Sequence, residues 1–196
     1  MPRPKTHDET LRLRLLHRAG ELLATEGVRA LSLRRLAADV GTSTTAVYSL
    51  FGGKSDLVNA LYGEGFRRFA ARLRAVRRTG EVVADIVGLC LAYREAALED
   101  PHRYSAMFAA AVPGFEPDDD TRKQAMSALE PLWDVVADGI SRGVLVDVPA
   151  DVIAVSCWGC AHGLVSLELN PTVPQGVDFC RTFEPSVRAT ASGWLR

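Results

Sequence analysis

The sequence contains no uninterrupted apolar run long enough to cross a bilayer, so it does not predict a membrane protein. Its first residues are charged, and no secretory signal peptide is expected. Cysteine occurs only four times in 196 residues, which favours a reduced cytoplasmic protein over a disulfide scaffold. No segment alternates convincingly between polar and apolar residues, so strands are not expected. Apolar residues recur instead at helical spacing, which predicts an all-α fold.

Signatures of catalysis are also missing. The chain has neither a nucleophile-elbow motif nor a Gly-rich phosphate loop. The fragment Cys157-Trp-Gly-Cys160 looks like a thioredoxin redox pair, and His162 could extend it toward a metal site. A redox pair normally lies where a strand leads into a helix, and a structural zinc site needs a second cluster of ligands. We therefore expect no enzyme, metal or cofactor and interpret the cysteines as buried small hydrophobic residues, with a thiol-redox enzyme as an alternative.

Charge is distributed unevenly along the chain. Residues 1–54 carry nine basic and five acidic side chains, a net charge of +4, although the whole chain has a net charge of −1. The remainder therefore carries −5. A basic head on an acidic body is expected where only the head meets phosphate groups. The arginines between Arg67 and Arg78 lie further along a predicted helix and are interpreted as a solvated helix face.

Three helices are predicted at the amino-terminal end. Leucines and an alanine recur at helical spacing between Asp8 and Val28, and Gly27 closes this first helix. Ser32 can cap a second, short helix over residues 33–40, whose apolar residues face inward. Gly41 then permits a sharp turn before the third helix. Two helices joined through a glycine turn in this way predict a helix-turn-helix unit.

The third helix is about two turns long, which is marginal in water without support from neighbouring helices. Val47, Leu50 and Phe51 are the apolar residues that can anchor it. Its hydroxyl groups then face outward, where they suit hydrogen bonds to base edges and phosphates. We expect Thr44 and Thr45 to meet base edges. The full set of candidate DNA contacts, from this helix and its neighbours, is Arg34, Thr42, Ser43, Thr44, Thr45, Tyr48, Ser49 and Lys54.

The spacing of these residues resembles the amino-terminal signature of the TetR family of transcriptional repressors. The matching residues are Gly27, Ser32, Leu36, Ala37, Gly41, Ser43, Tyr48, Phe51 and Lys54. The resemblance implies a TetR-like DNA-binding transcriptional regulator in the cytoplasm. It further implies a homodimeric repressor that a small-molecule effector releases from a near-palindromic operator in double-stranded DNA. A helical interaction protein with a degenerate head is a second alternative.

The resemblance divides the chain into a DNA-binding domain, residues 1–54, and a ligand-binding and dimerisation domain, residues 55–196. Helical spacing predicts a larger helical bundle in the second domain, with about nine helices in the whole chain. One of these helices carries Met126 and Ile140 and is expected to bend at Pro131. In the family, the helices of this body surround a small-molecule pocket. The candidate pocket residues are Phe66, Tyr93, Tyr104, Phe108, Met126 and Trp133.

The segment from Val152 to Leu169 is apolar nearly all round, so it should be buried against its own body and against a second subunit. Its Trp158-Gly-Cys-Ala-His162-Gly163 fragment resembles the Trp-x-x-x-His-Gly pattern of one group of TetR carboxy-terminal domains. In the family, the last two long helices of each subunit form the dimer interface. The candidate interface residues are Trp158, Gly159, His162, Gly163, Phe179 and Phe183.

Two glycines interrupt the predicted fourth helix, at Gly63 and Gly65. Each costs about 1 kcal/mol relative to alanine inside a helix, so a reason for their presence is expected. Either they let the helix flex where the head joins the body, or they allow another element to pack closely against it. The sequence leaves both interpretations open.

Overall fold

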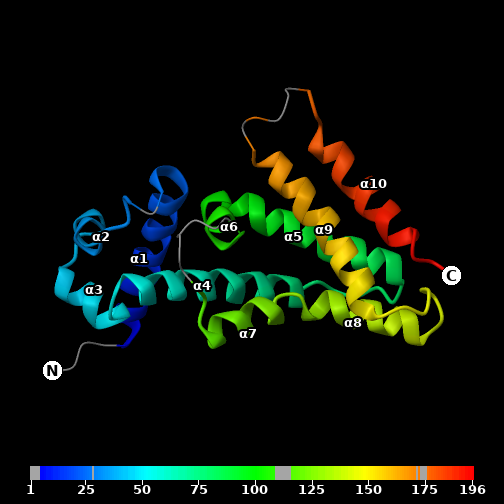
Figure 1. The fold of residues 1–196 in the computed structure, drawn as a ribbon, viewed down its shortest axis with the longest axis horizontal. Helices are drawn as coiled ribbons and strands as arrows, with labels where there is room; N and C mark the ends of the chain where they lie inside the picture. The colour runs from blue at the N-terminus through cyan, green and yellow to red at the C-terminus, as the bar shows by residue number, and fades with distance from the viewer. Residues whose placement is uncertain (1–4, 28, 109–115, 171, 173–175) are drawn as a thin grey trace. The chain divides into compact units, whose positions relative to one another are not determined.

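The computed structural model of the protein describes residues 5–27, 29–108, 116–170, 172 and 176–196 (Figure 1). Over these residues it contains ten helices and no named strand, which confirms the predicted all-α fold. The helices are α1 (Lys5–Glu26), α2 (Leu33–Val40), α3 (Thr44–Phe51), α4 (Lys54–Arg74), α5 (Val82–Glu99), α6 (Pro101–Phe108), α7 (Asp119–Ser127), α8 (Glu130–Ser141), α9 (Ala150–Glu168) and α10 (Phe179–Ser192).

The chain forms two compact units, and each is described by itself. The first unit comprises residues 1–67 and 100–125, and the second comprises residues 68–99 and 126–196. Helix α4 therefore contributes residues to both units. The domain boundary predicted at residue 54 follows the helix-turn-helix signature instead, and it remains a prediction.

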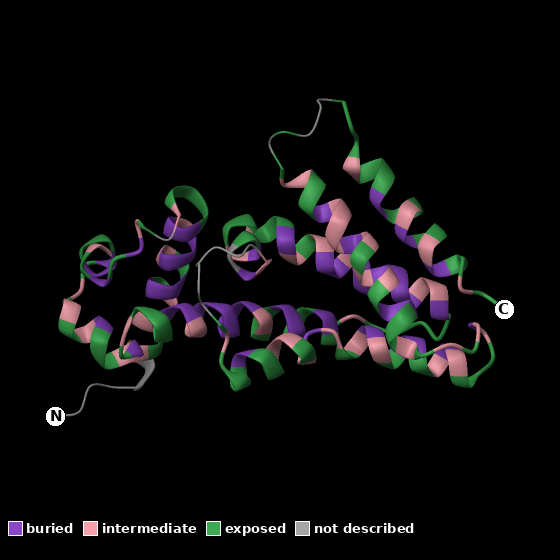
Figure 2. Ribbon diagram, in the orientation of Figure 1, coloured by how far each residue is buried: buried purple, intermediate pink, exposed green. Residues whose placement is uncertain are grey.

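The core of the first unit is built by the leucine-rich face of α1, together with α2, α3 and the start of α4 (Figure 2). Leu15 and Leu36 are completely buried, and so are Val47 of α3 and Leu57 of α4. The apolar face predicted for α2 is buried at every position. The core extends into α4 because the apolar residues of its first turns recur at helical spacing and therefore share one face of the helix.

The second unit is organised around α5, which packs against α8, α9 and α10. A buried carboxylate, Asp85, holds the chain that leads into α5. It accepts hydrogen bonds from the Thr79 amide at 2.6 Å, the Thr79 hydroxyl at 2.7 Å and the Gly80 amide at 3.1 Å. Burial alone would raise the pKa of Asp85, but these hydrogen bonds outweigh it and hold the pKa below its ordinary value.

Two predicted helices differ from those observed. The predicted bent helix around Pro131 is two helices, α7 and α8, because Pro131 lies in the first turn of α8 and starts it rather than bending it. Proline is favoured in a first helical turn, where an amide N–H has no partner within the helix. This division accounts for ten observed helices against about nine predicted. The helix predicted to carry the arginines up to Arg78 is shorter, because α4 ends at Arg74.

The two glycines inside α4 lie where other helices of the first unit approach it. A Cβ atom at Gly65 would lie 2.6 Å from the Met107 sulfur of α6. At Gly63 it would lie 2.6 Å from Oε1 of Gln124 of α7. Real Cβ atoms do not make such contacts, and α4 is continuous through both glycines. These contacts support the close-packing interpretation of Gly63 and Gly65.

Helix α9 is the single helix among the described residues that is long and apolar enough to cross a membrane, with a mean hydropathy of 1.4. Its buried residues, among them Ile153, Cys157 and Val165, pack in the second unit, where α9 contacts α5, α8 and α10. A core helix of a helical protein has the same length and composition. The apolar character of α9 is therefore weak support for a membrane span.

Replacing Asp85 with asparagine is expected to destabilise the second unit by about 2 kcal/mol at pH 7, because the amide loses the negative charge and one of the two oxygens that accept hydrogen bonds. The depressed pKa of Asp85 makes its contribution full above the pKa of the unfolded chain. That contribution is lost as pH falls through the folded-state pKa. Urea unfolding should therefore show a wild-type advantage that shrinks below about pH 4. The exposed Asp147→Asn variant is the control, and an equal loss in both variants would contradict the role of Asp85.

Candidate nucleic-acid interface

The turn between α2 and α3 is defined by local caps. Ser32 accepts a hydrogen bond from the Arg35 amide and begins α2, as predicted. Gly41 ends α2 in the left-handed region, with a φ of 72° that residues with a Cβ rarely adopt. Ser43 then begins α3 by accepting a hydrogen bond from the Ala46 amide at 3.1 Å. These contacts fix where both short helices start and stop.

Helix α3 presents its polar residues on the surface of the first unit. Its anchors Val47 and Phe51 are buried, while Leu50 is half-buried. Tyr48 exposes 53% of its surface, and Thr45 and Ser49 are exposed beside it. The remaining candidate contacts lie around them: Thr42 and Thr44 are half-buried, and Arg34, Ser43 and Lys54 are exposed. Seven of the eight candidates thus lie in the α2–α3 turn, in α3 or at the first residue of α4, whereas Arg34 lies in the first turn of α2.

Ion pairs brace α2 against α1. Arg18 donates to Asp39 at 2.8 Å, and Arg35 forms two hydrogen bonds with Glu26 at 2.7 and 2.8 Å. The hydrogen bonds from Arg35 hold the pKa of the exposed Glu26 carboxyl below its ordinary value. Arg14 donates to the carbonyl of Val40 at 2.9 Å, at the end of α2. Several arginines of α1 and α2 thus hold these two helices together, and neighbouring carboxylates partly neutralise their charge.

The arginines of the later part of α4 are also paired within the second unit. Arg72 contacts Glu95 and Glu99, each at 2.9 Å, and Arg74 contacts Glu130 at 2.8 Å. Their side chains remain between 40% and 51% exposed. This placement agrees with a solvated helix face and not with a second surface for phosphates.

The candidate pocket residues fall into separate groups. In the first unit, Phe108 packs against Phe66 and Tyr104, with ring centroids 5.8 and 4.9 Å apart. In the second unit, Tyr93 packs edge-on against Phe69, and its hydroxyl lies 2.9 Å from Nδ1 of His162. Two further candidates also belong to the second unit: Met126 exposes 66% of its surface and Trp133 is half-buried. Their role as pocket walls remains a prediction.

The candidate dimer residues are split between surface and core. Gly159 is exposed, and among the described residues outside the local helix backbone no atom lies within 4 Å of a Cβ built at Gly159 or Gly163. Trp158, His162 and Phe179 are half-buried. Phe183 is only 1% exposed and lies beneath the Arg94 guanidinium, which is 5.4 Å from the ring centroid. This burial leaves Phe183 almost no surface to offer a second subunit, because the ring packs under Arg94 of α5.

Sequence reasoning did not single out three exposed apolar residues of α9. Val152, Val155 and Leu167 are 45%, 48% and 49% exposed. With Gly159 and Gly163 they follow one stripe of the helix, at offsets of 3, 7, 11 and 15 residues from Val152. The all-round apolar composition of α9 was the available signal, but only the packing shows which face stays exposed.

The cysteines of the Cys157-Trp-Gly-Cys160 fragment lie inside α9, and Cys157 is completely buried. Burial raises the pKa of Cys157 to about 11, and burial likewise raises the pKa of Cys90. These thiols therefore stay protonated near neutral pH, whereas the thiolate is the reactive form. Burial also lowers the pKa of His162, so it stays neutral. Both shifts weigh against the thiol-redox alternative.

Comparison with known proteins places these features in a family. Residues 15–61 match the family described as bacterial regulatory proteins, tetR family. Residues 86–190, more than half of the chain, match the Tetracyclin repressor-like, C-terminal domain. The chain belongs to the TetR family.

Among solved structures, the regulatory protein named SCO4313 is 30% identical, with a TM-score of 0.79, and the match covers 97% of this chain and 98% of that one. A Rhodococcus sp. RHA1 protein of unknown function is 24% identical, with a TM-score of 0.81 and full coverage of both chains, and it shows the fold alone. The HTH-type transcriptional regulator Rv1816 of Mycobacterium tuberculosis H37Rv is 26% identical over 141 residues. That match covers 69% of this chain, and this chain spans 59% of the length of that relative.

The two serines of the α3 region offer a matched test of the cap. Ser43→Ala should cost the first unit about 1 kcal/mol, because the Ala46 amide at the start of α3 loses its side-chain acceptor. Ser49→Ala removes an exposed hydroxyl later in the helix and should change the free energy of unfolding by less than about 0.5 kcal/mol. Urea unfolding of the full chain measures both, and equal losses would refute the capping role.

Proposed function

We propose that the chain is a homodimeric, DNA-binding transcription regulator, a repressor that leaves its operator when a small-molecule effector binds. The observation that carries the proposal is the exposed polar face of α3, held by a capped glycine turn and two buried anchors. Membership of the TetR family and the match of residues 15–61 to its regulatory proteins support it. A regulator of this kind would act in the cytoplasm, where operator DNA is found.

The proposed contacts divide by chemistry. Thr44 and Thr45 lie in the first turn of α3, from which short hydroxyl side chains can reach base edges in the major groove, with Ser49 behind them. The proposed phosphate contacts come from the turn, from the middle of α3 and from the start of α4. We assign them to Thr42, Ser43, Tyr48 and Lys54, with Arg34 of α2 as an addition. Such contacts position the protein on DNA without reading its sequence.

The exposed stripe of α9 supports a dimer. Val152, Val155 and Leu167 flank two glycines beside which there is open space, so another helix can approach closely. Apolar surface of this kind is stabilised when a second copy covers it. A twofold dimer would place two copies of α3 about 34 Å or a multiple apart, which requires a near-palindromic operator.

An effector changes operator affinity only if it binds one conformational state more tightly than the other. Helix α4 contributes to both units and directly follows the α3 turn, so we propose that it carries the change. The aromatic residues Phe66, Tyr93, Tyr104 and Phe108 are the proposed effector contacts, with Trp133 and the exposed Met126 as weaker candidates.

Lys54→Gln and Thr44→Ala should affect DNA binding differently. Loss of the Lys54 charge should weaken binding to all sequences alike and reduce the slope of log affinity against log salt by about 1. Thr44→Ala should instead change the preference among operator variants, with an effect of about 1–3 kcal/mol at the affected base pair. Fluorescence anisotropy with operators selected from a random DNA pool measures both. The reverse pattern would refute the division of contacts.

Val155→Glu should shift the protein to a monomer, because a charge on the exposed stripe of α9 opposes its burial in an interface. Operator affinity should fall at least tenfold as a result, with helix content unchanged. Val177→Glu is the control, since Val177 is 49% exposed but lies outside α9. Sedimentation velocity reports the oligomeric state, and a Val155→Glu dimer would exclude this stripe as the interface.

A further inference from the structure

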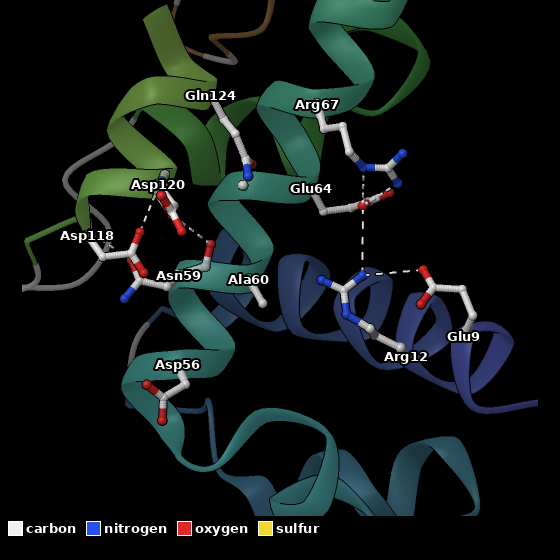
Figure 3. A pocket seen from close by; sticks show the side chains of 12 residues that line it. Glu9, Arg12, Asp56, Asn59, Ala60, Glu64, Arg67, Asp118, Asp120 and Gln124 are labelled. Atoms are coloured by element: carbon white, nitrogen blue, oxygen red, sulfur yellow. Dashed lines mark hydrogen bonds and ion pairs between the residues drawn. The ribbon is translucent and has the colours of Figure 1, made fainter. Parts of the chain in front are cut away.

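A polar cavity of about 440 Å³ lies within the first unit, between α1, α4 and the start of α7 (Figure 3). None of the predicted pocket or DNA-contact residues lines it. Its volume falls in the range of small-molecule sites, which run from about 300 to 1,000 Å³. Its polar lining suits a ligand that is charged and rich in hydrogen-bonding groups.

Hydrogen bonds fix two walls of the cavity. The backbone amide of Asp118 donates to Oδ1 of Asn59 on α4 at 3.1 Å. The Asp118 carboxylate in turn accepts from the Thr121 amide at 2.8 Å and caps the start of α7. The absence of a side chain at Gly63 leaves room for the Gln124 amide on the same side. The walls are therefore formed before any ligand enters.

A buried carboxylate, Glu64, lines the cavity beside Arg12 and Arg67 (Figure 3). The Glu64 side chain is only 3% exposed, and its Oε2 lies 2.6 Å from Nη2 of Arg67. Arg12 of α1 approaches the same oxygen less closely, with its Nη1 at 3.9 Å, and its Nη1 also lies 3.4 Å from Glu9. A buried carboxylate needs cationic partners, and Arg12 of α1 lies at the distance limit of an ion pair with Glu64. Arg12 is thus a loosely held, tethered cation at Glu64.

The lining is also short of positive charge. Two guanidinium groups, from Arg12 and Arg67, face five carboxylates, which leaves a formal charge of −3. The carboxylates belong to Glu9, Asp56, Glu64, Asp118 and Asp120. An additional cation in the cavity would therefore be attracted. The Arg12 guanidinium is an example of the kind of cationic group that pairs with the Glu64 carboxylate.

We propose that this cavity binds a small organic cation bearing a guanidinium or primary ammonium group, which takes the place of Arg12 at Glu64. The released Arg12 remains free to pair with Glu9 on its own helix. Occupation removes an ionic link between α1 and α4, the two helices that flank α2 and α3 in the chain. The consequence for operator affinity rests on the proposed function, but binding of the cation does not.

Isothermal titration calorimetry of the full chain with agmatine tests the binding. Agmatine carries a guanidinium and an ammonium group, and the neutral analogue 1-(4-hydroxybutyl)urea has a similar shape. Agmatine should bind at one site per chain, and the analogue at least tenfold more weakly. Equal binding of the two compounds would overturn the proposal.

Three variants locate the site. Glu64→Gln should weaken agmatine binding at least tenfold, whereas Glu184→Gln, which removes an exposed carboxylate paired with Arg188, should not change it. Arg12→Gln should strengthen binding several-fold, because the competing internal cation is gone. This increase cannot arise from misfolding, so it keeps the test decisive if Glu64→Gln is unstable. Weaker binding by Arg12→Gln, or unchanged binding by folded Glu64→Gln, would refute the assignment.

The effect on DNA is measured separately, by operator anisotropy at a fixed agmatine concentration. Agmatine also screens phosphates, so the effect of agmatine on operator affinity is compared between Glu184→Gln and Glu64→Gln. Agmatine should change the operator affinity of Glu184→Gln at least threefold more than that of Glu64→Gln. If agmatine binds in the calorimeter but the two variants do not differ in this way, the cation site is supported and its regulatory role is refuted. Failure of the ligand-free protein to bind any DNA would instead refute the proposed function.

Discussion

The burial of Val47 and Phe51 beneath α3 is the interaction on which the candidate DNA surface depends. An eight-residue helix cannot hold itself together in water, because its nucleation cost exceeds what so few backbone hydrogen bonds return. Burial of two such side chains contributes about 1.5–3 kcal/mol each and fixes the opposite face outward. The hydroxyl groups of α3 therefore face outward because Val47 and Phe51 are buried in the core of the first unit.

Ion pairing decides where the positive charge of the chain is presented. The first 54 residues carry a net charge of +4, yet Arg18 and Arg35 are engaged by carboxylates that brace α1 and α2. Arg72 and Arg74 are likewise engaged in the second unit. Charge in the sequence and charge available to a phosphate are thus different quantities. Arg34 and Lys54, in the first turns of α2 and α4, are both exposed.

Helices that meet more than one neighbour show what sequence reasoning missed. The apolar composition of α9 predicted burial on two sides, but only packing separates the buried Ile153 from the exposed Val155. In the sequence, Phe183 cannot be distinguished from an aromatic residue of an interface, yet in the structure it is buried beneath Arg94. Pro131 was expected to bend a helix and instead begins one. In each case, the outcome depends on a partner that is distant in sequence.

The amino-acid sequence by itself determined the helix-turn-helix element, including the bounds of α2, its buried face, the Ser32 cap and the turn at Gly41. It could do so because caps, glycine conformations and helical periodicity are settled by residues within a few positions of one another. Only the tertiary structure decided that Glu64 of α4 faces Arg12 of α1, across a cavity also lined by α7. Contacts between distant segments depend on how whole helix faces fit together, and no short stretch of residues encodes that fit.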